Sequence, residues 1–520
     1  MPAIADEQSS THPVENQSEH NTYGQILKSS AMVGGSQVLN ILIGMVRTKA
    51  MAVMLGPAGF GLFGLYSSVV SLAQTFAGMG INSSGVRQIA AAASYREEQL
   101  VAQTTLVLRR VSLFLGLLGA AFMIMFSRQI SSLTFASERH AGAISGLSIA
   151  VFFTLISGGQ AALIQGMRRI ADLAKMQVFG ALFGALCSIP LVYFFREKGV
   201  VPSLICVAAT AVVTSWLYSR RIAIAAISIG ASAVWRESGA LLKLGIAFMA
   251  SNLLTLGVAY VIRITVLRKV GYEATGLYQS AWSLGGLYVG FILQAMGADF
   301  YPRLTACAGD NIACSRLVNE QSRVGLLLAG PGVIATLTFA PLVIAIFYSA
   351  KFGAAVNILR WICLGTILQV ITWPMGYVIV AKAKRALFIG CEVAWSLVSL
   401  GLAWVCITHW GLTGAGISFF GSYIFHGIML YAIVARLCDF RWSSDNKRTA
   451  LISLSLVTIV FCGFYLLPLA WGVCLGIVAF LCSGGYSIRV ITTLLSPEQI
   501  PRPIKKLLAI CGLSMPNRAS

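Results

Sequence analysis

Apolar segments of about 20 residues follow one another along almost the whole chain, separated by short polar connections. A helix needs about this length to cross the hydrocarbon core of a bilayer. The bilayer core offers no water to backbone groups, so each segment must form its hydrogen bonds internally, which favours helices over open sheets. With 57% hydrophobic and 11% charged residues, the 520-residue chain is too apolar for a soluble protein. The sequence predicts an all-α, polytopic membrane protein.

The spacing of these segments predicts about fourteen transmembrane helices. We expect them at residues 28–55, 58–82, 108–127, 143–167, 174–194, 200–218, 238–266, 274–300, 323–348, 355–381, 386–408, 411–436, 449–468 and 470–492. Residues 1–24 are polar and lack the basic region of a signal peptide, so they are expected to form a disordered, retained cytoplasmic tail.

The chain is predicted to contain two pseudo-symmetric six-helix lobes. A basic connection after the sixth span separates an N-terminal lobe at 25–220 from a C-terminal lobe at 221–437, followed by two extra helices at 438–494 and a cytoplasmic tail at 495–520. A weak repeat supports this division, because Gly56 and Gly61 align with Gly271 and Gly276. Parallel repeats of this kind are typical of transporters that hold their substrate near the middle of the membrane.

The net charge of +20 suggests nucleic-acid binding at first sight. However, most Lys and Arg side chains fall in alternate connections and in the two tails. This asymmetry is the positive-inside pattern of membrane proteins. The charge therefore predicts that both termini are cytoplasmic, and no nucleic-acid partner is expected.

Four cations fall inside predicted spans, where a charge is costly and is a functional candidate by default. In the first span, Gln37, Asn40 and Arg47 lie on one helical face and form a polar stripe. Lys49 lies about 160° away from Arg47 and could extend outward to the interface. Arg47 either faces a central cavity or forms hydrogen bonds between helices.

The seventh span repeats this pattern, since Asn252 and Arg263 are separated by three helical turns. The repeat would place Arg47 and Arg263 at the same depth, where two guanidiniums could grip a diphosphate. The fourth intramembrane cation, Arg360, is a further candidate for this substrate site.

Glu392 is the one acidic residue well inside a predicted span. It either couples transport to a cation gradient or pairs with the nearby Lys384 or Arg385. The twelve cysteines are scattered, without metal-binding spacing. No metal, cofactor or catalytic residue is expected.

Several stretches together resemble the polysaccharide transport branch of the multidrug/oligosaccharidyl-lipid/polysaccharide exporter superfamily. This branch contains the Wzx-type flippases of O-antigen and enterobacterial common antigen. The stretches are "LGPAGFGL" from Leu55, "LIQGMRRIADLAKMQ" from Leu163, "KFGAAVNILRW" from Lys351, "GYVIVAKAKRALFIGCEVAW" from Gly376 and "GLTGAG" from Gly411.

The resemblance implies a flippase of the bacterial inner membrane that moves undecaprenyl-pyrophosphate-linked oligosaccharide by alternating access. Surface polysaccharide synthesis would then make a polysaccharide polymerase and a chain-length regulator its partners. Among the basic residues, the family pattern matches Lys49 rather than Arg47, and Glu392 matches an acidic position. The two extra helices resemble those of lipid II flippases, which implies a role in binding the lipid tail.

Two other functions remain open. A cation-coupled drug exporter of the same superfamily would favour an acidic cavity. The predicted spans instead contain three arginines and one lysine, and Glu392 is the one acidic residue well inside a span. A polysaccharide polymerase or ligase would need a large outer loop or a carboxylate pair, and the sequence contains neither.

Overall fold

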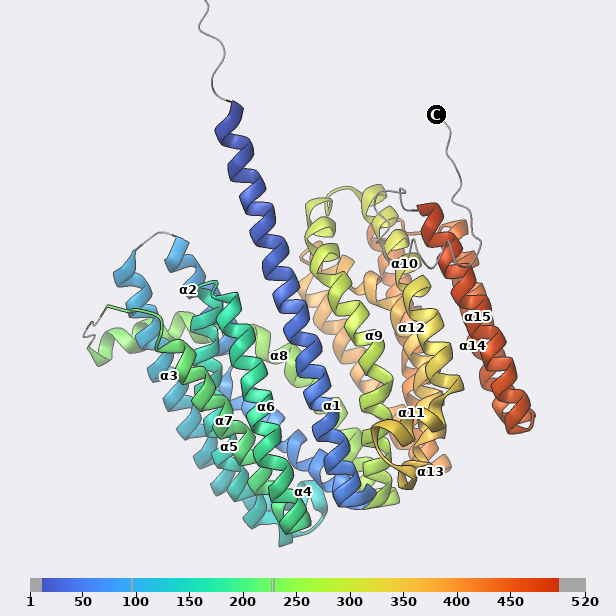
Figure 1. Ribbon diagram of the computed structural model, residues 1–520, viewed down its shortest axis with the longest axis horizontal. Coiled ribbons are helices and arrows are strands. Elements are labelled where there is room, and N and C mark those ends of the chain that lie inside the picture. Colours follow the sequence, from blue (N-terminus) through green and yellow to red (C-terminus); the bar gives the residue numbers. More distant parts are fainter. Residues whose placement is uncertain (1–11, 95–96, 226, 228–229, 495–520) are drawn as a thin grey trace, which may run out of the picture. The chain divides into compact units, whose positions relative to one another are not determined.

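The computed structural model describes residues 12–94, 97–225, 227 and 230–494, and every regular element in them is helical. Figure 1 shows these helices along the chain. The α-helices are α1 His12–Gly78, α2 Ile81–Ser94, α3 Glu98–Met125, α4 Ser127–Phe135, α5 Ala141–Gly166, α6 Ile170–Phe195, α7 Val200–Ser219, α8 Ala231–Val270, α9 Tyr272–Ala306, α10 Asn311–Thr338, α11 Ala340–Phe347, α12 Ala355–Ala381, α13 Arg385–Cys438, α14 Ser444–Leu466 and α15 Leu469–Leu494.

The predicted all-α membrane fold is confirmed. By length and composition, eight described helical segments could cross a membrane, or ten when two bent pairs each count as one crossing. Three of the eight are 44, 50 and 54 residues long, about twice the length of one crossing. Each of the three contains a break, at Gly56, between α6 and α7, and at Gly411. Each predicted pair of spans in these regions therefore corresponds to the two parts of one long segment, one on each side of its break.

The N-terminal segment differs from its prediction in one respect. Helix α1 begins at His12, so residues 12–24 of the predicted disordered tail are helical. Residues 1–11 and the predicted cytoplasmic tail at 495–520 lie outside the described residues.

The chain forms two compact units, and their boundary differs from the predicted one. Unit 1 comprises residues 1–54 and 66–253, and unit 2 comprises residues 55–65 and 254–520. The first part of α8 belongs to unit 1 because Leu241 packs in a core with Ile81 and Val107. A Cβ on Gly80 would overlap the carbonyl oxygen of Gly245, and a Cβ on Gly245 would overlap the carbonyl oxygen of Met79. Tertiary packing thus moves the boundary from residue 220 into α8.

The repeated glycines contact each other inside unit 2. Gly56 and Gly271 both have positive φ, at 67° and 112°, a region that favours glycine. A Cβ on Gly61 would lie 2.8 Å from Gly276 N, and a Cβ on Gly276 would lie 3.0 Å from Gly61 N. The two aligned copies therefore pack on each other reciprocally, backbone against backbone.

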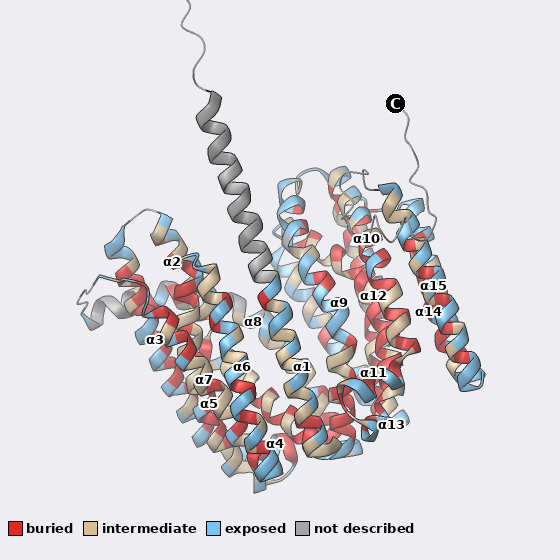
Figure 2. Ribbon diagram, viewed as in Figure 1, coloured by how far each residue is buried: buried red, intermediate tan, exposed pale blue. Residues whose placement is uncertain are grey.

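A hydrophobic core in unit 2 joins α9, α10, α12 and α13 through Phe300, Val318, Val378 and Val434. Figure 2 shows this band of buried residues, which is most continuous along α12. The chain then bends by 81° between α10 and α11, directly before Pro341. Pro331 and Pro374 lie within continuous helices.

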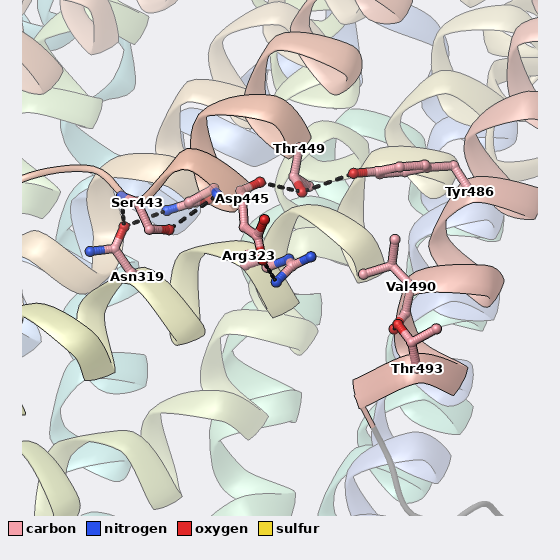
Figure 3. A network of polar contacts seen from close by, with 9 residues as sticks. Asn319, Arg323, Ser443, Asp445, Thr449, Tyr486, Val490 and Thr493 are labelled. Carbon is pink, nitrogen blue, oxygen red and sulfur yellow. Dashed lines mark hydrogen bonds and ion pairs between the residues drawn. The ribbon is translucent and has the colours of Figure 1, made fainter. Parts of the chain in front are cut away.

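The two extra helices, α14 and α15, belong to unit 2 and pack against α10. At one end, Asn319 of α10 accepts a hydrogen bond from Ser443 N at 2.8 Å and donates to Arg441 O at 3.0 Å. Nearby, Arg323 forms an ion pair with Asp445 at 2.6 Å (Figure 3). We call this end of unit 2 the network end.

The same network reaches α15, where the hydroxyls of Thr449 and Tyr486 lie 3.2 Å apart (Figure 3). At the other end, α14 and α15 are joined by a turn at residues 467–468. Phe60 packs there against Tyr348 and Phe352, close to the repeated glycines. We call this opposite end the turn end.

Candidate functional site

Arg263 is a half-buried cation on α8, in a helix that the sequence predicts to lie in the membrane. Its Nε donates a hydrogen bond to Gln279 Oε1 on α9 at 2.7 Å. Gln279 in turn donates to Ser283 Oγ at 3.2 Å. This chain of hydrogen bonds fixes the orientation of the Arg263 guanidinium.

Gly64 makes room for this arrangement. A Cβ on Gly64 would lie 3.1 Å from Gln279 Cγ, which is tighter than an ordinary side-chain contact. Sequence reasoning missed Gln279, although a signal was present. Gln279 is the repeat partner of Gly64, three residues beyond the aligned pair Gly61 and Gly276.

The structure separates the two cations of α1 onto different faces. Arg47 is half-buried and its Nε and Nη2 atoms are shielded, and Gln37 and Asn40 on the same stripe are also half-buried. Lys49 is exposed, on the face that carries Val46 and other exposed apolar side chains. This arrangement agrees with the helical geometry, which assigns Arg47 to the polar stripe and lets Lys49 extend outward.

The predicted substrate residues fall into separate groups. Arg47, Lys49, Gln37 and Asn40 belong to unit 1, as does Asn252, whose side chain is exposed on α8. Arg263 belongs to unit 2. The shared grip of Arg47 and Arg263 on a diphosphate stays a prediction.

Arg360 also belongs to unit 2 but has other surroundings than Arg263. It is 7% exposed, and its guanidinium lies 3.8 Å from the ring centroid of Phe464 on α14. It lines a separate cavity at the turn end. The residues that line this cavity do not include Arg263, Gln279 or Ser283.

Glu392 lies half-buried in the first half of α13. Among the described residues there are four ion pairs, and none of them includes Glu392. No ion pair therefore supports the alternative in which Glu392 pairs with Lys384 or Arg385. By contrast, Asp299 and Arg303 do form an ion pair at 3.1 Å, with both side chains exposed.

Aromatic and imidazole rings gather between the two halves of α13: Trp395 lies about one helical turn beyond Glu392, and Tyr423 and His426 lie beyond the Gly411 break. The ring centroid of His426 lies 5.6 Å from that of Trp395 and 5.8 Å from that of Tyr423. In the described part of the chain, neither His426 Nδ1 nor Trp395 Nε1 has a hydrogen-bond partner. The contact between His426 and Trp395 depends on how the two halves of α13 pack across the Gly411 break, which local sequence spacing does not give.

Comparison with protein families identifies the chain over more than half of its length. Residues 50–357 match the family described as "Polysaccharide biosynthesis protein". The lipid III flippase of Escherichia coli (strain K12) is 23% identical over 403 residues, which cover 77% of this chain and 95% of that protein.

Solved structures show that the fold is shared with transporters. The lipid II flippase MurJ in an inward closed conformation matches with a TM-score of 0.65 at 14% identity, covering 89% of this chain and 99% of that one. A multidrug resistance MATE family transporter in an inward-facing conformation matches with a TM-score of 0.62 at 16% identity, covering 76% and 95%. The family match runs from within α1 to the start of α12 and includes the Arg263 cluster and the repeated glycines, and the chain is a member of the polysaccharide biosynthesis protein family.

Proposed function

We propose that this protein is a flippase, not an enzyme, and that it moves undecaprenyl-pyrophosphate-linked oligosaccharide repeat units across the bacterial inner membrane. The observation that carries the proposal is the guanidinium of Arg263, which Gln279 holds in a predicted span of a polysaccharide biosynthesis protein. A pre-oriented guanidinium suits a pyrophosphate, because a phosphate group accepts two parallel hydrogen bonds from it. The fold shared with transporters supports alternating access as the route.

The sequence repeat supports the proposal that Arg47 and Arg263 bind the pyrophosphate, with Gln37, Asn40 and Asn252 as further hydrogen-bonding residues. The positive-inside distribution of charge supports a cytoplasmic position for both termini and for the network end of unit 2. After translocation, the lipid-linked oligosaccharide becomes the substrate of a polymerase, which builds a surface polysaccharide together with a chain-length regulator.

Glu392 is the coupling residue of this proposal. Its carboxyl group lies half-buried in a span, without an ion-pair partner among the described residues, and so is suited to bind and release a proton or another cation. We expect Glu392→Gln to abolish the dependence of transport on a pH or sodium gradient in proteoliposomes. Unchanged gradient dependence in this variant would remove Glu392 from the mechanism.

The decisive experiment follows the lipid-linked intermediate. In cells that lack the gene, a polyprenyl-pyrophosphate oligosaccharide should accumulate on the inner leaflet, and the wild-type gene should clear it. Arg263→Ala should clear it at least tenfold more slowly, since a charge-assisted hydrogen bond to a phosphate contributes about 1.5–3 kcal/mol. The matched control is Arg303→Ala, which removes an exposed arginine of an i,i+4 ion pair and should transport normally.

Two outcomes would overturn the proposal. One is full clearance by both Arg263→Ala and Arg47→Ala. The other is a gene deletion that leaves the lipid intermediate unchanged but lowers resistance to cationic drugs, which would favour a multidrug exporter of the same fold.

A further inference from the structure

The cavity at the turn end of unit 2 lies apart from the Arg263 cluster and has a volume of about 460 Å³. This volume is within the range of small-molecule sites. Its walls come from α11, the following connection, the first turns of α12 and the start of α15. The lining residues used below are Ser349, Gly353, Val356, Asn357, Arg360 and Leu469.

The cavity contains a cation without a counter-charge. Arg360 is 7% exposed, and neither its Nε nor its Nη2 has a hydrogen-bond partner within the described residues. Phe464 covers one face of the guanidinium, which shields it from water but provides no acceptor. None of the residues that line the cavity is acidic. A buried cation in this state costs several kcal/mol unless a ligand neutralises it.

Two further features favour an anion at this position. The Oγ of Ser349 is also buried and lacks a partner in the described part of the chain, and it lines the same cavity. Val356 and Asn357 belong to the first turn of α12, so the positive end of the helix dipole faces this space and favours negative charge there. Arg360 and Ser349 thus supply side-chain donors to one space at the start of α12.

Exposed apolar side chains on α11 and α15, two of the helices that wall the cavity, indicate which anion it receives. Leu342 and Ile346 of α11 are 56% and 50% exposed, and Leu469 and Trp471 of α15 are 64% and 67% exposed. In a membrane protein such side chains contact acyl chains, and Trp is frequent at the level of the lipid headgroups. The surroundings therefore suit a phosphate that carries acyl chains better than a free inorganic ion.

We infer that the turn end of unit 2 binds the phosphate of an anionic phospholipid, with Arg360 and Ser349 as its ligands and α14–α15 as its cover. The two extra helices thereby have a role that concerns the membrane lipid, distinct from pyrophosphate binding at Arg263. This inference requires only that the protein crosses the membrane, and it does not depend on the proposed flippase function.

The test uses the full-length protein, purified in detergent and stripped of lipid. Thermal unfolding is followed while dioctanoyl phosphatidylglycerol is titrated in. The wild type should gain a saturable increase in Tm, and Arg360→Met should lower the apparent affinity for the lipid at least about tenfold. Ser349→Ala should have a smaller effect of the same kind. The matched control, Arg268→Met, removes an exposed cation from the end of α8 and should keep the full response.

Three comparisons distinguish the sources of the phosphate. Dioctanoyl phosphatidylcholine and inorganic phosphate should each produce less than a tenth of the increase in Tm at equal concentration. An equal response to inorganic phosphate would overturn the assignment to a lipid, and tighter Arg360-dependent binding of a short polyprenyl pyrophosphate would assign the site to the transported lipid. A full phosphatidylglycerol response in Arg360→Met would overturn the site itself.

If Arg360→Met fails to fold, Arg360→Lys provides the second variant. It keeps the charge but loses the planar stacking on Phe464, so native mass spectrometry should find fewer retained phosphatidylglycerol molecules than in the wild type. Equal retention in the two proteins would contradict the role of the guanidinium.

Discussion

The two ends of unit 2 each hold a shielded arginine, but only one of these has a carboxylate partner. At the network end, Arg323 is paired with Asp445 at 2.6 Å, beside the hydrogen bonds of Asn319. At the turn end, Arg360 is stacked on Phe464 and has no ion-pair partner among the described residues.

The same α14–α15 pair covers both ends, so the difference arises from the polar groups and not from the helices. Polar groups that bond to one another hold the hairpin in place, whereas the unpaired cation costs stability until a ligand arrives. The comparison therefore predicts that removal of a polar side chain lowers the Tm at the network end, whereas removal of Arg360 raises it at the turn end. Substitutions that disturb the close packing of the turn end are a separate case.

The largest effect is expected from Gly276→Ala, which tests whether the turn end is built on glycine contact. The added methyl group would overlap the Pro57 carbonyl oxygen and lie 3.0 Å from Gly61 N. Because backbone cannot move aside cheaply, we expect a loss of about 3 kcal/mol or more, seen as a lower Tm. Gly286→Ala on the same helix is the control, since nothing lies within 4 Å of its Cβ position. Equal Tm values for the two variants would contradict the close packing of the repeats.

At the network end, Asn319→Ala should lower stability by about 2–3 kcal/mol. Asn319 is only 9% exposed, so little water can replace its side chain. The substitution therefore leaves Ser443 N and Arg441 O without their hydrogen-bond partner. The measurement is thermal unfolding in detergent, with the exposed Asn311→Ala of the same helix as the control. An unchanged Tm would show that the network does not anchor α14.

At the turn end, Arg360→Met should act in the opposite direction. In lipid-free detergent, removal of the unpaired buried cation should raise stability by about 1 kcal/mol, because an apolar side chain of similar length suits the site better. Arg323→Met, which leaves Asp445 without its partner, should instead lower the Tm. The comparison fails if both variants change the Tm in the same direction.

The smallest effect is expected from Tyr486→Phe, which removes one hydroxyl from the network end. Its contact with Thr449 is 3.2 Å long, so the loss should be about 0.5–1 kcal/mol. Tyr465→Phe, at a tyrosine that is 52% exposed near the turn end, serves as the control and should leave the Tm unchanged. A loss above that of Asn319→Ala would mean that Thr449 and Tyr486, rather than Asn319, hold the hairpin.

The sequence predicts the helices well because the bilayer allows few alternatives. Hydrophobic length alone indicates the crossings at α3, α5 and α12, and glycine at 56 and 411 marks where long helices break. Helical periodicity likewise separates Arg47 from Lys49, since the two residues are close in sequence and their relation is purely local.

The candidate site was predicted only in part. Arg263 was recognisable as a cation in a span, but its partner Gln279 depends on how α9 packs on α8. Arg360 was grouped with the substrate residues because sequence gives depth along a helix and not the direction that a side chain faces. Its cavity is formed by α11, α12 and α15, segments that only tertiary packing brings together.

Sequence by itself thus determined that this is an α-helical membrane protein with a repeated glycine pattern and cations in its predicted spans, because hydrophobic length and local periodicity act within single helices. The tertiary structure decided that α8 is divided between two units, that the repeated glycines pack reciprocally, and that Arg323 has a carboxylate partner while Arg360 does not. These features depend on contacts between residues far apart in the chain, which only the folded backbone brings within hydrogen-bonding distance.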